Sequence, residues 1–186
     1  MTQPLPRPLL VLDLDETLWH GMADAGVPGG LRLLLRPRLA EFLETVSTAY
    51  DLAIWTAASE DWMLEGLAGI QAAHGVDLPE RSFFVWHRER CTVRRDAEGN
   101  YGLCKPARKF NARWIRAKYP RNRILVLDDQ AANYACGYGH LVKLSAWHGE
   151  AEDDELRQLA AYLLSIAGEP DLRRLEKRGW RSRPQS

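Results

Sequence analysis

The chain has 186 residues, of which 46% are hydrophobic and 27% are charged. These proportions are typical of one soluble globular domain with a substantial core, and the length leaves room for a small insertion. Lysine and arginine together number 25, as do aspartate and glutamate, so the formal net charge is zero. This balance gives no global reason to expect binding to nucleic acid or to a membrane surface.

Two further features bear on the compartment in which the chain works. No apolar run is long enough to span a bilayer, and the first such run, residues 9–12, is too short for the core of a secretory signal. The three cysteines, Cys91, Cys104 and Cys136, are few and odd in number, which favours reduced thiols. We therefore expect a cytoplasmic protein that does not associate with membranes.

The first elements are predicted as follows. Residues 1–8 are rich in proline and are expected to be a flexible lead-in. Residues 9–12 are a continuous apolar run that ends in acid, a pattern typical of a strand buried on both faces of a parallel sheet. Residues 21–30 contain several glycines and a proline and predict a loop. A helix is expected to begin at Pro37, because apolar side chains follow it at helical spacing: Leu39, Phe42, Leu43 and Val46.

The middle of the chain continues the alternation of strands and helices. Residues 51–56 are a second predicted strand, and Ser59 can cap a helix that runs towards His74 and stops at Gly75. Residues 83–86 are a third apolar run. Residues 90–104 are polar and β-prone, with turn residues at 96–100, so they predict a hairpin.

The last third of the chain completes the pattern. Residues 107–119 predict a helix, and residues 123–129 and 141–144 predict two more strands. A final helix is expected where apolar residues form one stripe: Leu156, Leu159, Ala160, Leu163 and Leu164. Strands that alternate with helices predict an α/β fold, a doubly wound (Rossmann-like) parallel sheet with helices on both faces and a small β-hairpin insertion.

Acidic side chains follow two of the predicted strands. Asp13 and Asp15 come directly after the first strand, and Asp128 and Asp129 end the fourth. Because sites in this fold class lie beyond the carboxyl ends of the strands, we expect these carboxylates at one edge of the sheet. Carboxylates in one crevice repel each other unless a cation or a shared proton offsets the cost. Hard oxygen ligands without histidine or cysteine favour Mg²⁺ over zinc or copper.

Four motifs, in this order, resemble the haloacid-dehalogenase (HAD) superfamily: Asp13-Leu-Asp-Glu-Thr17-Leu-Trp-His20, Trp55-Thr56, Lys105 and Asp128-Asp129. The similarity extends to its small C-terminal-domain phosphatase branch, the Nif-interacting-factor-like domain. Further fragments resemble that branch: Arg36-Pro37, Glu41-Phe42-Leu43, Asn100-Tyr101 and the stretch from Trp147 to Leu156. The resemblance covers roughly residues 9–166, and several motifs at fitting spacing are far more specific than any one alone.

The resemblance implies a role for each motif. Asp13 would attack phosphorus and become an aspartyl phosphate. Asp15 would protonate the leaving oxygen and then deprotonate the water that hydrolyses the intermediate. Thr17, Thr56 and Lys105 would bind the phosphate, with Lys105 also neutralising charge on Asp13.

The resemblance also implies the ligands of a magnesium ion. Mg²⁺ would be held by the Asp13 carboxylate, the backbone carbonyl of Asp15 and an oxygen of Asp128 or Asp129. The lysine of the third motif has two alternatives. Pro106-Ala107 follows Lys105 where the branch has an acidic residue and leucine. Lys109 and Lys118 are therefore the alternatives to Lys105.

Other side chains have two open interpretations. His20 either positions the catalytic loop or is an ordinary packed or exposed histidine. Cys91 and Cys104 flank the hairpin, where free thiols are favoured over a cross-strand disulfide. Six aromatic residues either belong to the core or line a substrate pocket: Trp19, Trp55, Trp62, Phe83, Phe84 and Trp86.

The implied organisation is a HAD-like phosphatase domain at residues 9–168, with a small insertion at about 88–104, between the lead-in and a basic tail at residues 169–186. So small an insertion leaves the site open to water and to large substrates. The resembling branch acts on phosphoserine in disordered peptide, so a phosphorylated protein segment is the expected partner. The sequence gives no indication of the oligomeric state.

Two other functions stay open. The basic stretch from Arg173 to Arg183 would suit a phosphatase of nucleotides or nucleic-acid ends, although such stretches are usually solvated chain ends. The third possibility is a phosphate-recognising scaffold without catalysis. Such a scaffold would have no need of a second acid-base carboxylate such as Asp15.

Overall fold

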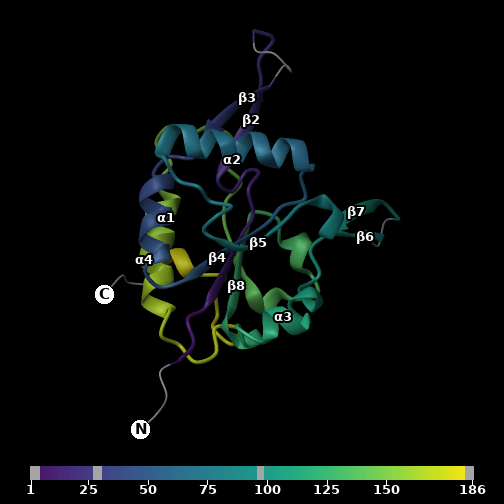
Figure 1. Ribbon diagram of the computed structural model, residues 1–186, viewed down its shortest axis with the longest axis vertical. Coiled ribbons are helices and arrows are strands. Elements are labelled where there is room, and N and C mark those ends of the chain that lie inside the picture. The colour runs from purple at the N-terminus through teal and green to yellow at the C-terminus, as the bar shows by residue number, and fades with distance from the viewer. Residues whose placement is uncertain (1–4, 27–30, 96–98, 183–186) are drawn as a thin grey trace.

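A computed structural model describes residues 5–26, 31–95 and 99–182. Its centre is a five-stranded sheet in the order β5-β4-β1-β8-β9, and every neighbouring pair is parallel. The strands are β1 (Leu9–Leu12), β4 (Asp51–Trp55), β5 (Ser82–Trp86), β8 (Ile124–Asp128) and β9 (Leu141–Lys143). All five predicted strands are present, and the predicted doubly wound α/β fold is confirmed (Figure 1).

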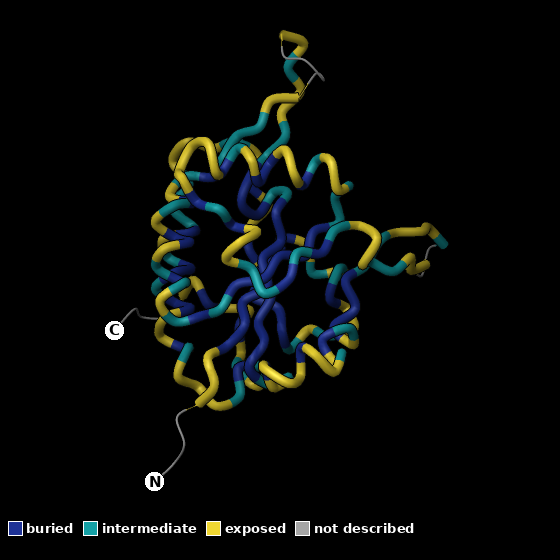
Figure 2. The backbone as a smooth tube through the Cα atoms, in the orientation of Figure 1, coloured by how far each residue is buried: buried dark blue, intermediate teal, exposed yellow. Residues whose placement is uncertain are grey.

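Two separate cores cover the two faces of this sheet, because alternate side chains of a strand point to opposite faces. Leu10 and Leu12 of β1 pack in one core with the helices α1 (Leu39–Ser47), α2 (Glu60–His74) and α4 (Glu155–Ile166). Leu9 and Val11 pack in the other, under α3 (Arg113–Arg116) and η2 (Ala107–Asn111). Burial on both faces explains the uninterrupted apolar run of β1 (Figure 2).

Two antiparallel hairpins project from the sheet (Figure 1). The predicted one is formed by β6 (Thr92–Arg95) and β7 (Tyr101–Cys104), and part of its predicted turn, residues 96–98, lies outside the described residues. The other, formed by β2 (Trp19–Ala23) and β3 (Leu31–Leu35), corrects the prediction of a loop over residues 21–30. Residues 27–30 lie outside the described part of the chain. The glycines of this stretch favoured a loop, but Gly21 lies in β2, opposite Leu33 of β3. Leu33 and Leu35 of β3 are partly buried against the core.

The helices differ from prediction at two places. Pro37 lies in a turn, and α1 begins at Leu39, after Arg38 adopts a φ of 62°. The predicted helix over residues 107–119 is replaced by η2 and α3, because Ala112 between them has a ψ of 134°. Phe110 and Ile115 are both buried, yet they would lie about 140° apart around one continuous helix. The break lets both reach the same core.

The remaining short elements are 3₁₀ turns at η1 (Arg88–Arg90), η3 (Arg121–Arg123), η4 (Ala131–Tyr134), η5 (Tyr138–His140) and η6 (Trp180–Ser182). Within the described ranges, no helix combines the length and apolarity needed to cross a bilayer.

The C-terminal segment packs on the domain as far as residue 182, which differs from the expected solvated end. Leu172 and Trp180 are buried, and the Trp180 indole N–H donates to the carbonyl of Lys143 at 2.9 Å. Lys177 is also buried, and its ammonium group donates to the carbonyls of Leu172 and Leu175. At the other end, residues 1–4 are not described, and Arg7 pairs with Asp51 at 3.0 Å.

Helix α2 and the first hairpin fit together through two glycines. The indole of Trp19, in β2, lies against Gly66 of α2 so closely that a β-carbon there would overlap the ring. Reciprocally, the indole of Trp62, in α2, lies over Gly21 of β2, where a β-carbon would be 2.8 Å from the ring. Each glycine therefore makes room for a tryptophan of the facing element.

We predict that Gly66→Ala destabilises the protein by about 1–3 kcal/mol, because the added methyl group overpacks a fully buried Trp19. In an unconstrained helix the same change would stabilise by up to about 1 kcal/mol. Gly69→Ala is the matched control, since its β-carbon meets only the flexible end of Leu33, at 2.5 Å. Urea unfolding of the two variants measures the difference, and equal stabilities would contradict the prediction.

His140 is a buried histidine held in a neutral form. Its Nδ1 lies 2.8 Å from the carbonyl oxygen of Ile124, and its ring meets Phe110 edge-on with centroids 5.5 Å apart. Nε2 is buried and has no hydrogen-bond partner among the described residues. Burial, helped by the nearby Arg173 and Arg121, lowers the pKa of His140 to about 4 despite the bond to Ile124.

We predict that His140 contributes to acid unfolding. The unfolded chain binds a proton at this residue near its ordinary pKa of 6.5, whereas the folded chain does not until about pH 4. The free energy of unfolding should therefore fall as the pH falls from 6.5 to 4, by about 3 kcal/mol from this residue. His140→Phe should reduce that slope, while His74→Phe, at an exposed position, should retain it. Urea titrations at several pH values test this, and a slope that His140→Phe leaves unchanged would exclude the contribution.

Candidate active site

The predicted acids lie at the topological switch point of the sheet. From β1 the chain proceeds to β4 and β5 on one side, and it later returns to β8 and β9 on the other. Ligand sites of doubly wound folds lie at the carboxyl ends of the strands at such a point. Asp13 follows β1, and Asp128 ends β8, with Asp129 next. Carboxylate oxygens of these three residues lie within 4.8 Å of one another.

Lys105 is completely buried among these acids. Its ammonium group donates to Oδ1 of Asp13 and, at 2.7 Å, to Oδ2 of Asp128. Burial by itself would lower the pKa of Lys105, but the two carboxylates raise it well above its ordinary value, so the amine is charged. The two lysines that the sequence offered as alternatives to Lys105 have other partners. Lys109 donates to the carbonyl of Arg90, and Lys118 pairs with Asp51.

When its three carboxyl groups are ionised, the cluster carries more negative than positive charge. Burial, and then the neighbouring Asp128, raise the pKa of Asp13 well above its ordinary value, although Lys105 opposes the effect. The same two causes raise the pKa of Asp129 to about 6. One ammonium group does not balance three carboxylates, and the surrounding donors are all hard oxygens. This donor set fits Mg²⁺, whose two charges would remove the excess.

Asp128 is fixed in place by several donors. Its Oδ1 accepts the backbone N–H of Gln130 at 2.8 Å and the side-chain amide of Asn133 at 2.9 Å. The backbone carbonyl of Asn133 in turn accepts the N–H of Lys105 at 2.9 Å. Asn133 therefore connects Lys105 with Asp128. It lies in the turn η4, which no sequence motif indicated as functional.

Asp15 is held by two tryptophans and a threonine. Its Oδ1 accepts the indole N–H of Trp19 at 3.0 Å and that of Trp62 at 2.5 Å, and its Oδ2 accepts the hydroxyl of Thr56 at 3.2 Å. The Thr56 hydroxyl also accepts the N–H of Ala58 at 3.0 Å. The carboxyl group of Asp15 is thus oriented from β2, from α2 and from the end of β4.

Sequence reasoning missed this use of the tryptophans, which it treated as core or pocket-lining residues. The spacing of Asp15 and Trp19 offered a weak signal, because a buried indole N–H usually finds an acceptor. No local signal could have linked Asp15 with Trp62, which is 47 positions away.

Thr17, also in the first motif, contacts Asp13. It is fully buried, and its hydroxyl donates to Oδ2 of Asp13 at 3.4 Å. Its backbone carbonyl accepts the guanidinium of Arg36 at 3.1 Å. Arg36 also pairs with Asp153 and Glu155, each at 2.9 Å, so it connects the first motif with the segment before α4.

The aromatic residues left open by the sequence belong mostly to the core. Trp19 and Trp55 are fully buried, and Phe84 is 7% exposed. Trp86 stacks on Phe84 and also lines a surface hollow with Arg90 and Trp114.

The cysteines of the hairpin are free thiols. Cys91 and Cys104 each point to a backbone carbonyl, that of Thr56 at 3.7 Å and that of Thr92 at 3.3 Å respectively. The disulfide that the sequence left open is therefore not formed.

Sequence comparison identifies relatives across nearly the whole chain. The pattern of the NLI interacting factor-like phosphatase family matches residues 8–173. The ubiquitin-like domain-containing CTD phosphatase of Arabidopsis thaliana is 30% identical over 180 residues, 95% of this chain and 51% of that protein. The ubiquitin-like domain-containing CTD phosphatase 1 of Xenopus laevis is 27% identical over 180 residues, 94% of this chain and 54% of that protein. The chain thus spans about half the length of these relatives.

Among solved structures, Fcp1, described as an essential RNA polymerase II CTD phosphatase, is similar with a TM-score of 0.52 and 19% identity. The match covers 89% of this chain and 51% of Fcp1, and at this identity it shows a shared fold. The family match, the relatives and the fold agree with the motifs that resemble the HAD superfamily. The chain belongs to the NLI interacting factor-like phosphatase family, a HAD-type branch of phosphatases.

Proposed function

We propose that this chain is a Mg²⁺-dependent phosphate-monoester phosphatase that uses Asp13 as its nucleophile. The observation that supports this most is the buried contact of Lys105 with Asp13 and Asp128 at the switch point of the sheet. This contact places the Asp13 carboxylate beside the Lys105 ammonium group and near Asp128 and Asp129. Phosphoryl transfer requires such positive charge around the transferring group. Membership of a phosphatase family supports the same reaction.

In the proposed reaction, an Asp13 oxygen forms a bond to phosphorus while the bond from phosphorus to the ester oxygen breaks. Asp15 gives its proton to that leaving oxygen. Asp15 then takes a proton from water, whose oxygen attacks the aspartyl phosphate and releases inorganic phosphate and the Asp13 carboxylate. Lys105 offsets the negative charge of the carboxylate and of the phosphoryl oxygens, and Thr17 orients Asp13.

The residues that would hold Mg²⁺ are Asp13, Asp128 and Asp129, with the Asp15 carbonyl implied by the resemblance. When bound, the ion would neutralise the charge on the transferring phosphoryl group.

We infer that the substrate is a phosphorylated protein segment. An open hollow touches Cys104 and Pro106, the two sequence neighbours of Lys105. It is lined by residues of the second hairpin, of the start of η2 and of the turn that carries Asn133: Thr92, Val93, Arg94, Cys104, Pro106, Arg108, Asn133, Ala135 and Cys136. An extended peptide could enter such a hollow, and Arg94 and Arg108 could pair with acidic or phosphorylated positions beside the reacting one. The names of the relatives, CTD phosphatases, agree with a protein substrate.

Hydrolysis of p-nitrophenyl phosphate with Mg²⁺ tests the reaction. We expect Asp13→Asn to lower kcat/KM by roughly a thousandfold or more, because the amide is not a nucleophile. Asp61→Asn, at an exposed acid of α2, should retain activity. Excess EDTA should abolish turnover, and added Mg²⁺ should restore it. Inactivity of the wild type from about pH 5 to 8 would favour a phosphate-binding scaffold, and full turnover in EDTA would exclude the metal.

Turnover of three substrates then tests the substrate class. We expect a phosphoserine peptide to be preferred over a phosphorylated oligonucleotide and over a sugar phosphate. Three arginines of the C-terminal segment pair with acids, namely Arg174 with Asp171, Arg178 with Glu176 and Arg181 with Glu155. This pairing weakens the nucleic-acid alternative, which a preference for the oligonucleotide would restore.

Trp62→Phe tests the orientation of Asp15. The change keeps an aromatic ring over Gly21 but removes the N–H that donates to Asp15 at 2.5 Å. Loss of one hydrogen bond to a carboxyl group should lower kcat about 10- to 100-fold with little change in KM. Trp114→Phe, at a residue 48% exposed, is the control and should leave kcat unchanged. A wild-type kcat in Trp62→Phe would show that the bond does not assist the reaction.

A further inference from the structure

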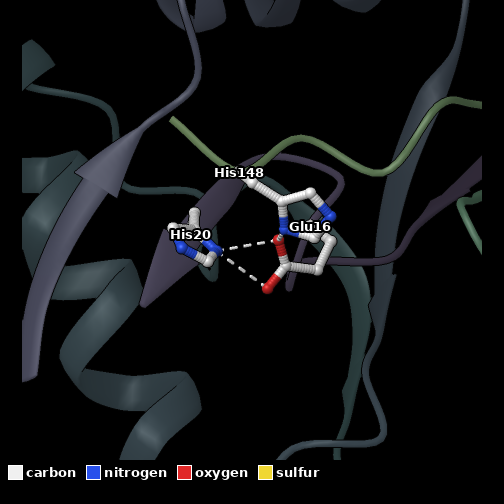
Figure 3. Close-up of side chains that lie close together, drawn as sticks. All are labelled: Glu16, His20 and His148. Atoms are coloured by element: carbon white, nitrogen blue, oxygen red, sulfur yellow. Dashed lines mark hydrogen bonds and ion pairs between the residues drawn. The ribbon is translucent and has the colours of Figure 1, made fainter. Parts of the chain in front are cut away.

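A second group of ligand-type side chains includes one residue of the catalytic loop, residues 13–18. It shares no residue with the acidic cluster of Asp13, Asp128 and Asp129. It consists of Glu16, His20 and His148, and one ligand atom from each lies within 4.8 Å of the others. Glu16 follows Asp15, His20 belongs to β2, and His148 lies between β9 and α4. Figure 3 shows the two imidazole rings on either side of the Glu16 carboxylate.

The two histidines converge on one carboxylate oxygen. The Nδ1 atom of His20 lies 2.8 Å from Oε2 of Glu16 and 3.0 Å from its Oε1, and Nδ1 of His148 lies 2.9 Å from the same Oε2. The rings are nearly perpendicular, at 86°, with centroids 5.3 Å apart. Three potential ligands thus lie around one point, and the contacts of both histidines with Glu16 hold them there.

The backbone of Glu16 is held in an uncommon conformation that directs its side chain to this point. Its φ is 56°, in the left-handed region that residues other than glycine rarely adopt. Two hydrogen bonds maintain it, since Glu16 N–H donates to the carbonyl of Trp19 and its carbonyl accepts the N–H of Trp147, both at 2.8 Å. Strained backbone that the surroundings maintain in this way is common at ligand sites.

The donor set differs in chemistry from that of the acidic cluster. Two imidazoles and one carboxylate are the ligands of open zinc sites, in which water completes the coordination. Oxygen ligands alone favour magnesium, whereas imidazole suits zinc. The site is also reachable, because the side chain of His148 is 58% exposed and that of Glu16 is 26% exposed.

We propose that Glu16, His20 and His148 bind one Zn²⁺ ion, which is separate from the Mg²⁺ of the proposed phosphatase reaction. Binding takes place through neutral imidazoles and the Glu16 carboxylate, so protons that occupy the ligand atoms are released to solvent. The ion joins three segments that are distant in sequence: the catalytic loop, β2 and the loop between β9 and α4. It thereby fixes the residue next to Asp15 without replacing any group of the acidic cluster.

Calorimetric titration of Zn²⁺ into the chelator-treated full chain tests the proposal. Saturating Mg²⁺ is present throughout, so that the acidic cluster does not compete. We expect one equivalent of Zn²⁺ to bind the wild type, and His148→Ala to weaken its affinity by at least roughly 100-fold, because loss of a ligand costs more than loss of an outer partner. His74→Ala removes an exposed histidine of α2 and should leave the affinity unchanged.

Thermal unfolding gives a second readout that needs no turnover. Zn²⁺ should raise the unfolding midpoint of the wild type and of His74→Ala, but not that of His148→Ala. Because His148 is exposed, we expect this variant to fold, and a midpoint equal to that of the metal-free wild type verifies its folding. Equal Zn²⁺ affinity in the wild type and His148→Ala would place the ion elsewhere, for instance at the free thiols, and would overturn the proposal. So would the absence of Zn²⁺ binding to the wild type.

Discussion

The site depends on one buried ion-pair network, that of Lys105 with Asp13 and Asp128. Removing three carboxylates and an ammonium group from water is costly, and their attraction offsets that cost only where the geometry is good and other donors satisfy the acids. Here Gln130 and Asn133 supply such donors to Asp128, and Thr17 supplies one to Asp13. The network draws together the ends of β1 and β8 with the residue that follows the second hairpin. When all three carboxyl groups are ionised, one negative charge or more remains unbalanced, and a divalent cation would offset it.

Around this network the structure uses rigid aromatic packing to orient the second carboxylate. Trp19 and Trp62 reach Asp15 from facing elements, and Gly66 and Gly21 provide the space for their rings. Gly66 in α2 and Gly21 in β2 thus influence the orientation of the Asp15 side chain through the tryptophans that bond it. Because the indoles have few rotamers and pack closely against these glycines, we expect them to position Asp15 more tightly than flexible polar side chains would.

The loop between β1 and β2, residues 13–18, is also tied to the segment before α4. Arg36 bonds the carbonyl of Thr17 and pairs with Asp153 and Glu155, while Glu16 accepts the N–H of Trp147. The same segment brings His148 to Glu16. One short loop therefore contributes to two groups of potential ligands with different chemistry: Asp13 lies near other carboxylates in a buried site, and Glu16 lies near two imidazoles at the surface. If both proposed ions bind, these different surroundings would account for the selection of different cations by nearby acids.

The sequence by itself determined the parallel strands, the helix between Ser59 and Gly75, and the placement of Asp13, Asp128 and Asp129 at one edge. Apolar runs, caps and strand-end acids are local patterns, and in a doubly wound fold they suffice to predict where the acids gather. The chemical roles of those acids stay predictions. Only the tertiary structure decided that Trp62 bonds Asp15, that β2 pairs with β3, that the helix breaks at Ala112 and that Trp180 packs on the domain. Each of these depends on which surfaces meet across long stretches of chain, and local periodicity records that a side chain is buried but not against what.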